Sequence, residues 1–494
     1  MLDRVSPTAQ PELPRSDLTR DIACGARENN APRAQSRALA IRVATALAAI
    51  VILLAPALWN RFPLLEYDTG GYLARWFEGY LVPSRSTVYG LFLAAGWPLD
   101  FWPVIFLQAA SAVWILALVF HTHGLGERPF TFLLVIAMLS ATTALSWNAS
   151  MLLTDIFVGL AVLALHLLVF KSGRFALWER IALIGFIAFA TATHSATFLV
   201  ALGLVTLAVL ISFIDRMRVP RMAALHAAGA VALGAVMLLT ANYIVARTIA
   251  WTPGGYGIVF ARMLEDGIVT HYLDEHCPDP RFRLCPYRKE LPPTADDFLW
   301  GESVFNDFGR FDGMGEEMRT IVLESLVAYP FKQIETALAA AAKQLVMVKT
   351  GEGVITEIWH TYGMIEMYTP SVLPAMRAAR QQHDEVHFES VNAVHVPVAF
   401  AGMIFLPIAM FLAMRRRFNA DIGILAATAA LAIVMNACVC GPLSNAHDRY
   451  GARIVWIAPF VMLLAPLRRH SSTARARPPG QNLTPMKTDP LPSS

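Results

Sequence analysis

Ten apolar segments of helical length dominate the sequence. A helical bilayer crossing needs roughly 17 to 25 mostly apolar residues, and only helices and closed barrels satisfy their backbone groups in lipid. The segments have the length of helices, so we expect an all-α polytopic membrane protein with about ten transmembrane helices. The expected spans are residues 43–59, 101–120, 130–147, 151–170, 181–193, 196–214, 222–246, 394–414, 422–437 and 454–467.

Composition agrees with a membrane protein. Of 494 residues, 56% are hydrophobic and only 16% are charged, which is more apolar surface than a water-soluble domain can bury. We expect a disordered basic cytoplasmic tail, a module of seven spans with a long first outer loop, a mainly helical extracytoplasmic lobe, three further spans and a second disordered cytoplasmic tail. These parts cover residues 1–42, 43–246 (with the loop at 60–102), 247–393, 394–467 and 468–494.

Basic residues set the expected orientation, because cytoplasmic loops are enriched in Lys and Arg. With the N-terminus inside, the arginines at 216–221 and 415–417 and those of both tails are cytoplasmic. Residues 181–214 admit two readings, one overlong helix or two short helices broken near His194. A single helix would move the arginines at 216–221 and 415–417 outside, so we prefer two helices.

Most polar sequences then fall on the outer side, whereas the inner loops are short and basic. Ionisable groups at span ends are costly unless they serve a site or a partner. The asymmetry predicts an active site that faces outward. The outer polar sequences are Glu66 to Arg85, Asn148 to Asp155, His194-Ser195, residues 247–393, and Asn445 to Tyr450.

The first outer loop opens with acidic residues. Glu66 and Asp68 flank Tyr67 and are followed by Thr69-Gly70-Gly71. Asp68 is compatible with two roles, the N-cap of the next helix or a catalytic carboxylate. Glu66 looks more like a supporting or interfacial residue.

Aromatic residues follow at helical spacing. Tyr72, Trp76, Phe77 and Tyr80 predict helices that lie in the membrane interface, and Tyr72 is also a candidate for supporting the site. Arg85 stands in the second polar turn of this loop.

Two polar residues interrupt apolar segments on the outer side. Asp155 lies one turn into the expected fourth span, where a carboxylate should face the bundle interior or a cavity. It is equally compatible with a helix cap paired with Thr154 or Asn148. His194 is read chiefly as a hydrogen-bonding residue at a helix break, with a supporting position in the site as the alternative.

The sequence from His447 to Arg453 precedes the last expected span. Arg449 and Arg453 are suited to binding a lipid phosphate through bidentate hydrogen bonds. Asp448 could instead hold Arg449 in a structural ion pair, and both readings stay open. His447 and Asp448 are further candidates for supporting positions.

The cysteines bear on compartment and metal binding. Cys277 and Cys285 are spaced for a small disulfide loop in an oxidising compartment, whereas Cys438 and Cys440 could pair with each other only under strain. The cluster His271-Asp274-Glu275-His276-Cys277 contains metal-ligand types, but its spacing matches no common site. We assign no metal ligands, and a divalent metal remains a possible cofactor.

The arrangement resembles the GT-C membrane glycosyltransferases, with bacterial aminoarabinose transferases and protein mannosyltransferases as the nearest members. The resemblance rests on an acidic first loop, interfacial helices, a basic residue late in that loop, an acidic residue between the third and fourth spans, and an outer lobe. It implies that Asp68 is the catalytic acid of the first loop, that Arg85 meets the carrier phosphate, and that Asp155 is the second acidic residue. Glu66 and Asp68 flank a tyrosine here, whereas family members often have adjacent acidic residues followed by Arg and Tyr.

The resemblance implies transfer of a sugar from a polyprenyl-phosphate donor to a lipid, glycan or protein acceptor outside the cytoplasm of a bacterial inner membrane. Membrane lipids are further expected partners, and nucleic acid is not. Dinucleotide and phosphate-loop motifs are missing from the sequence, in agreement with a donor that brings its own leaving group. A transporter or flippase and a non-catalytic assembly protein are the alternatives. A transporter would need polar residues near the middle of several spans.

Overall fold

The computed structural model describes residues 36–81, 83–215 and 217–475, with side chains as far as Arg468. Regular structure in these residues consists of helices, and the one β contact there is an isolated parallel bridge between Leu64 and Met151. The all-helical fold expected from the apolar segments is therefore confirmed for this part of the chain.

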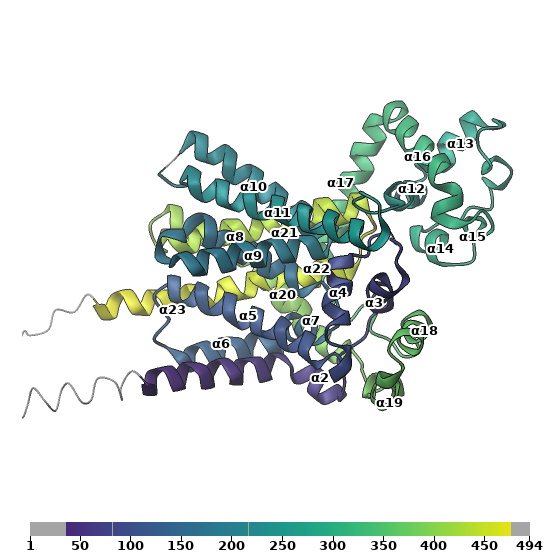
Figure 1. Cartoon of the computed structure of the whole chain (residues 1–494). Helices are drawn as coiled ribbons and strands as arrows, with labels where there is room; N and C mark the ends of the chain where they lie inside the picture. The colour runs from purple at the N-terminus through teal and green to yellow at the C-terminus, as the bar shows by residue number, and fades with distance from the viewer. Residues whose placement is uncertain (1–35, 82, 216, 476–494) are drawn as a thin grey trace, which may run out of the picture.

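Long helices run side by side and form a bundle (Figure 1). Its members are the helix Ser36–Leu53, α2 (Ala55–Asn60), α5 (Trp102–Thr122), α6 (Pro129–Thr142), α7 (Leu145–Ser150), α8 (Ile156–Phe170), α9 (Leu177–Thr193), α10 (Ser195–Ile214), α11 (Arg221–Ala246), α20 (Glu389–Met414), α21 (Ala420–Leu443), α22 (Asp448–Val455) and α23 (Ile457–Arg475).

Seven helices in the described residues are long and apolar enough to cross a membrane, as expected of a membrane protein. They are Ser36–Leu53, α5, α10, α11, α20, α21 and the combined segment Asp448–Arg468. The apolar helices α6 and α8 are shorter, and α9 has 17 residues with Glu179 and Arg180 in its first turn. The expected count of ten is thus not reached by length and hydropathy alone.

Three helix boundaries differ from the sequence expectation. The first helix begins at Ser36, so residues 36–42 are helical, although they were expected in the disordered tail. Asp155 lies just before α8 rather than one turn inside it, because residues 151–155 form a non-helical connection. Helix α23 continues to Arg475, so residues 468–475 are helical, although they were expected in the second disordered tail. The rest of both expected tails, residues 1–35 and 476–494, lies outside the described residues.

The apolar stretch 181–214 is two helices. Helix α9 ends at Thr193 and α10 begins at Ser195, with His194 in extended conformation between them. The His194 side chain accepts a hydrogen bond from the Ala196 N–H, so it caps α10. The break returns the chain on itself, and α9 and α10 pack against each other and against α11.

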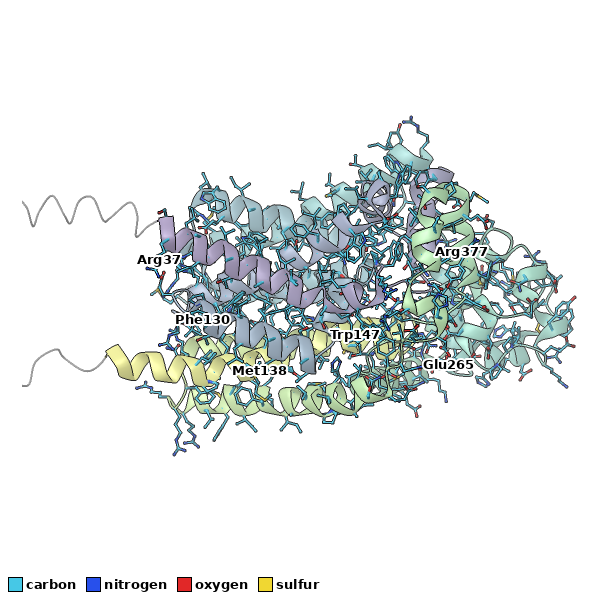
Figure 2. All side chains as sticks on the ribbon, turned by 90° about the horizontal axis from the view of Figure 1, so that it is seen from below. Arg37, Phe130, Met138, Trp147, Glu265 and Arg377 are labelled. Carbon is cyan, nitrogen blue, oxygen red and sulfur yellow. A yellow bond between two sulfur atoms is a disulfide. The ribbon has the colours of Figure 1, made fainter. Side chains whose placement is uncertain are left out.

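The two ends of the described chain lie at one end of the bundle, and the lobe lies at the other. The start of the first helix and the end of α23 are at one end, and the lobe extends from the other (Figure 1). In Figure 2, Arg37 marks the first end, whereas Glu265 and Arg377 lie at the second. The described chain therefore starts and finishes at the same end of the bundle.

The lobe has a hydrophobic core of its own, with Phe260, Phe298 and Met318 at its centre. Cys277 and Cys285 are joined by a disulfide, the pairing that their spacing suggested, with their Cα atoms 5.5 Å apart. The lobe helices are α12 (Gly255–Glu265), α13 (Ile268–His276), α14 (Ala295–Trp300), α15 (Val304–Asp307) and α16 (Arg310–Ala328).

Shorter helices cover the end of the bundle that carries the lobe (Figure 1). The expected interfacial helices are α3 (Thr69–Glu78) and α4 (Thr87–Ala94), which pack on each other. The others are α17 (Pro330–Val346), α18 (Trp359–Tyr368) and α19 (Leu373–Arg377). Helix α17 lies along α21, where Gly441 permits a close approach to the Ala340 carbonyl.

The packing of α11 on α9 generates a matched pair of substitutions. A Cβ at Gly234 would overlap Thr191 Oγ1 and lie 2.8 Å from the Ala188 carbonyl oxygen, whereas a Cβ at Gly229 would meet nothing within 4 Å. We expect Gly234→Ala to destabilise the protein by about 1–3 kcal/mol through overpacking, and Gly229→Ala to leave stability unchanged or slightly raised. Thermal unfolding of both variants in detergent measures this, and equal melting temperatures would contradict the packing.

Candidate functional site

A short backbone contact brings two acidic segments together. The Leu64 N–H donates to the Ser150 carbonyl at 2.9 Å, and the Leu152 N–H donates to the Leu64 carbonyl at 3.0 Å. Glu66 lies two residues after Leu64, and Asp155 lies four residues after Met151, its partner in the bridge. The bridge therefore places the start of the first outer loop beside the residues that precede α8.

Gln381, far along the chain, forms hydrogen bonds with the backbone next to Leu64. Its side chain accepts from the Leu65 N–H at 3.0 Å and donates to the Leu65 carbonyl at 2.8 Å. Its own N–H donates to Asn60 Oδ1 at 2.8 Å. Leu65 is buried and its backbone N–H and carbonyl have no partners in the bridge, so the Gln381 side chain supplies their hydrogen bonds.

The two glycines after Asp68 allow close approach of two other elements. A Cβ at Gly70 would lie 2.6 Å from Thr361 Cα in α18, and one at Gly71 would lie 3.3 Å from Arg85 Nε. The Thr361 hydroxyl also accepts from the Gly70 N–H at 3.1 Å. The Gly-Gly pair thus holds α3 against α18 and makes room for Arg85.

Asp68 occupies the N-cap position of α3, but its side chain forms no capping hydrogen bond. Instead it forms a short ion pair with Arg85 through Oδ1 and a second with Arg449 through Oδ2, at 3.0 Å. Of the two roles that the sequence left open, the capping role is wrong.

Arg449 is surrounded by carboxylates. Its Nη1 forms a short ion pair with Glu66, its Nη2 pairs with Asp68, and its Nε lies 3.4 Å from Asp155 Oδ2. Glu66 is 2% exposed and touches Arg449 directly. Glu66, predicted as a supporting or interfacial residue, thus lies in direct contact with Arg449.

Arg453 lies one turn after Arg449 and is buried. Its Nη1 is 3.5 Å from Asp155 Oδ1, and its Nη2 donates to Asn436 Oδ1 and to Cys440 Sγ, each at 3.0 Å. Asp155 therefore pairs with two arginines and is not held as a helix cap by its side chain.

Three distant segments thus contribute six charged side chains to one cluster, which we call the charged cluster. The segments are the first outer loop, the connection before α8, and α22. Its members are Glu66, Asp68, Arg85, Asp155, Arg449 and Arg453.

The loop between α17 and α18 supplies a residue that the sequence analysis missed. Glu352 accepts from the Arg449 N–H at 2.7 Å and contacts His447 Nδ1 at 2.8 Å. Gly353 has a φ of 80°, and a Cβ there would overlap the Glu66 carboxylate. The sequence pattern that could have indicated Glu352 is a carboxylate between two glycines, Gly351 and Gly353, since glycines allow the backbone to approach other groups closely.

The remaining expected residues lie around the charged cluster. Tyr72 is buried, stacks its ring near the Arg85 guanidinium, and contacts Thr154 at 3.4 Å. Asp448 accepts from the Lys349 N–H at 2.9 Å and forms no ion pair with Arg449 among those found in the described residues. The structural pairing proposed for these two neighbours is therefore wrong.

The lobe residues of metal-ligand types, to which no metal was assigned, have other partners. His271 pairs with Glu275, Asp274 pairs with Arg288, and Cys277 is in the disulfide. No group of three or more metal-ligating side chains suited to an ion is found in the described residues.

No family model, curated protein or solved structure matches this chain.

Burial and neighbouring charges separate the two first-loop carboxyls. Burial raises the pKa of Glu66 to about 7 against the opposing effect of Arg449, with Asp68 and Asp155 adding to the rise. Burial acts in the same direction on Asp68, but Arg85 and Arg449 outweigh it and hold the pKa of Asp68 at about 2. Near neutral pH, Asp68 is thus an anion, whereas Glu66 is poised between its two forms.

His447 connects the cluster to the lobe. Its ring lies between Glu352 and Asp296, with Nε2 3.6 Å from the Asp296 carboxylate at the start of α14. Burial alone would lower the pKa of His447, but Glu352 and Asp296 outweigh it and raise the pKa above the usual 6.5. The imidazolium therefore favours the folded arrangement.

This arrangement predicts a loss of stability at alkaline pH. Because the folded state raises the pKa of His447, its contribution is complete below pH 6.5 and is lost as the pH rises through the raised value. We expect His447→Gln to remove this part of the pH dependence. Melting temperatures of both proteins between about pH 6 and pH 9 test it, and parallel curves would contradict it.

Proposed function

We propose that this protein is a membrane glycosyltransferase that moves a sugar from a polyprenyl-phosphate donor to a lipid, glycan or protein acceptor on the outer side of a bacterial inner membrane. One observation carries the proposal. Asp68, Arg85, Asp155 and Arg449, which the family resemblance and the polar pattern singled out separately, contact one another in the charged cluster.

The cluster has the groups that the transfer requires. The acceptor oxygen or nitrogen attacks the anomeric carbon, its proton passes to Asp68, and the bond from that carbon to the phosphate oxygen breaks. The departing polyprenyl phosphate gains negative charge, which Arg449 and Arg85 stabilise. One bond forms, between the acceptor and the anomeric carbon, and one bond breaks, between that carbon and the phosphate oxygen. The step therefore needs no further reactant.

Arg449 also controls the basicity of Asp68 in this mechanism. With both arginines in place, Asp68 is too weak a base for efficient proton transfer near neutral pH, since its pKa is about 2. When Arg449 turns toward the phosphate, Asp68 keeps Arg85 but loses one cation, and its affinity for a proton rises. Donor binding thereby prepares the base.

Asp155 and Arg453 support Arg449 in the proposal. Arg453 is 1% exposed and holds one oxygen of Asp155, and the other oxygen faces Arg449 at 3.4 Å. Both arginines also lie beside the Tyr450 ring, at 5.1 and 4.9 Å from its centre. Because Arg453 holds Asp155 in place, Arg449 can keep its contact with Asp155 while it exchanges Glu66 or Asp68 for the phosphate.

The membrane arrangement follows from the same proposal. The helices α6, α8 and α9 would complete ten spans together with the seven longer helices, with both tails cytoplasmic. An even number of spans is supported by the position of the start of the described chain and the end of α23, which lie at the same end of the bundle (Figure 1). The charged cluster and the lobe would then face the outer side.

Asp68→Asn tests the proposed chemistry. We expect transfer of sugar from a radiolabelled polyprenyl-phosphate sugar to fall by about 100-fold to 10,000-fold, because the asparagine cannot take the acceptor proton. Asp384→Asn, at a position outside the cluster, serves as the matched control and should keep wild-type activity. Thermal unfolding checks that both variants fold.

Two results would contradict the proposal. Full transfer by Asp68→Asn would exclude the carboxylate as the base. Movement of the labelled lipid across the membrane by the wild-type protein, with the sugar still attached, would favour a transporter.

A further inference from the structure

The three carboxylates of the charged cluster differ in how many cations hold them. Asp68 pairs with Arg85 as well as Arg449, and Asp155 has Arg453 as well as Arg449. Glu66 forms an ion pair with one basic side chain of the described residues, Arg449. Glu66 is therefore the carboxylate that depends most on Arg449.

Arg449 has no nitrogen facing away from these carboxylates. Nη1 meets Glu66, Nη2 meets Asp68, and Nε faces Asp155. A guanidinium binds a phosphate best through two neighbouring N–H groups in one plane. Because Nη1 and Nη2 are the nitrogens that already hold Glu66 and Asp68, a phosphate that binds both nitrogens competes with these carboxylates for Arg449.

We propose that a phosphodiester donor displaces Glu66 from Arg449 and that Glu66 takes up one proton from solvent as the donor binds. This inference rests on the proposed function, since it assigns the phosphate of the lipid-linked sugar to Arg449. No covalent bond of the donor changes in this step. A monoanion and a proton enter together, so the charge of the cluster is unchanged.

Burial supplies the reason for the proton. The cluster holds three carboxylates and three arginines, and Glu66 is 2% exposed. Without Arg449, ionised Glu66 would be a buried anion with no cation beside it, which is strongly unfavourable. Protonation removes that charge, whereas Asp68 and Asp155 keep Arg85 and Arg453 and stay ionised.

The surroundings of Glu66 favour the same step. Asp68 and Asp155 face it with negative charge, Arg449 faces it with positive charge, and the exposed Tyr67 also interacts with it electrostatically. The Asp68 N–H donates to Glu66 Oε2 at 2.7 Å, a bond that survives protonation of the other oxygen. With its pKa already near 7, Glu66 requires little further change to become protonated.

Proton uptake can be counted without any transfer reaction. Farnesyl methyl phosphodiester is a suitable probe, because its single charge is constant across the working pH range. Calorimetric titration of the full-length protein in two buffers of different ionisation enthalpy gives the protons bound per probe. We expect close to one proton at about pH 8 and about a tenth of a proton at about pH 6.

The affinity should change in parallel. Above about pH 7, each pH unit should weaken probe binding by about tenfold, and below about pH 6 the affinity should be constant. Glu66→Gln imitates the protonated state, so its binding should be independent of pH and without proton uptake. Glu357→Gln removes an exposed carboxylate from the nearby loop and should behave like the wild type.

The outcomes separate this inference from the proposed function. Probe binding by the wild type without proton uptake, or uptake that persists in Glu66→Gln, overturns the inference and leaves the phosphate site standing. Failure of the wild type to bind the probe at any pH overturns both. The wild-type proton count decides the matter even where Glu66→Gln does not fold.

Discussion

The ion pairs of Arg449 with Glu66, Asp68 and Asp155 are the interaction on which the outer end of the molecule depends. Glu66 and Asp68 come from the first outer loop and Asp155 from the connection before α8, and their like charges would repel one another without the arginine. A buried carboxylate without a cation is costly, so the loop, the connection before α8 and α22 hold one another in place.

This arrangement explains the unusual backbone around the cluster. The Leu64 bridge to Met151 and the Gln381 side chain fix the first loop, and Gly70 and Gly353 bring α18 and its preceding loop against it. In the proposed transfer, the rearrangement of Arg449 takes place when the donor binds, so that little reorganisation remains for the step in which the phosphate leaves.

The sequence allowed a large part of the fold to be predicted. The apolar runs located the helices of the bundle, and the arginines at 216–221 argued for the break that the structure has at His194. The sequence also singled out five ionisable residues close to the ends of apolar spans, where charge is costly: Asp68, Arg85, Asp155, Arg449 and Arg453. Residues such as Glu352 and Gln381 escaped notice because their importance lies in backbone partners at distant positions.

The apolar runs and the charged residues between them determined by themselves that the chain folds into helices, since span length and backbone hydrogen bonding in lipid leave few alternatives. They also determined at which ends of the helices charge is concentrated. Only the tertiary structure decided that Asp68 is not a cap, that Glu66 belongs to the charged cluster, and that Asp448 pairs with the Lys349 backbone instead of Arg449. These choices depend on contacts between segments up to several hundred residues apart, for which a single sequence carries no local signal.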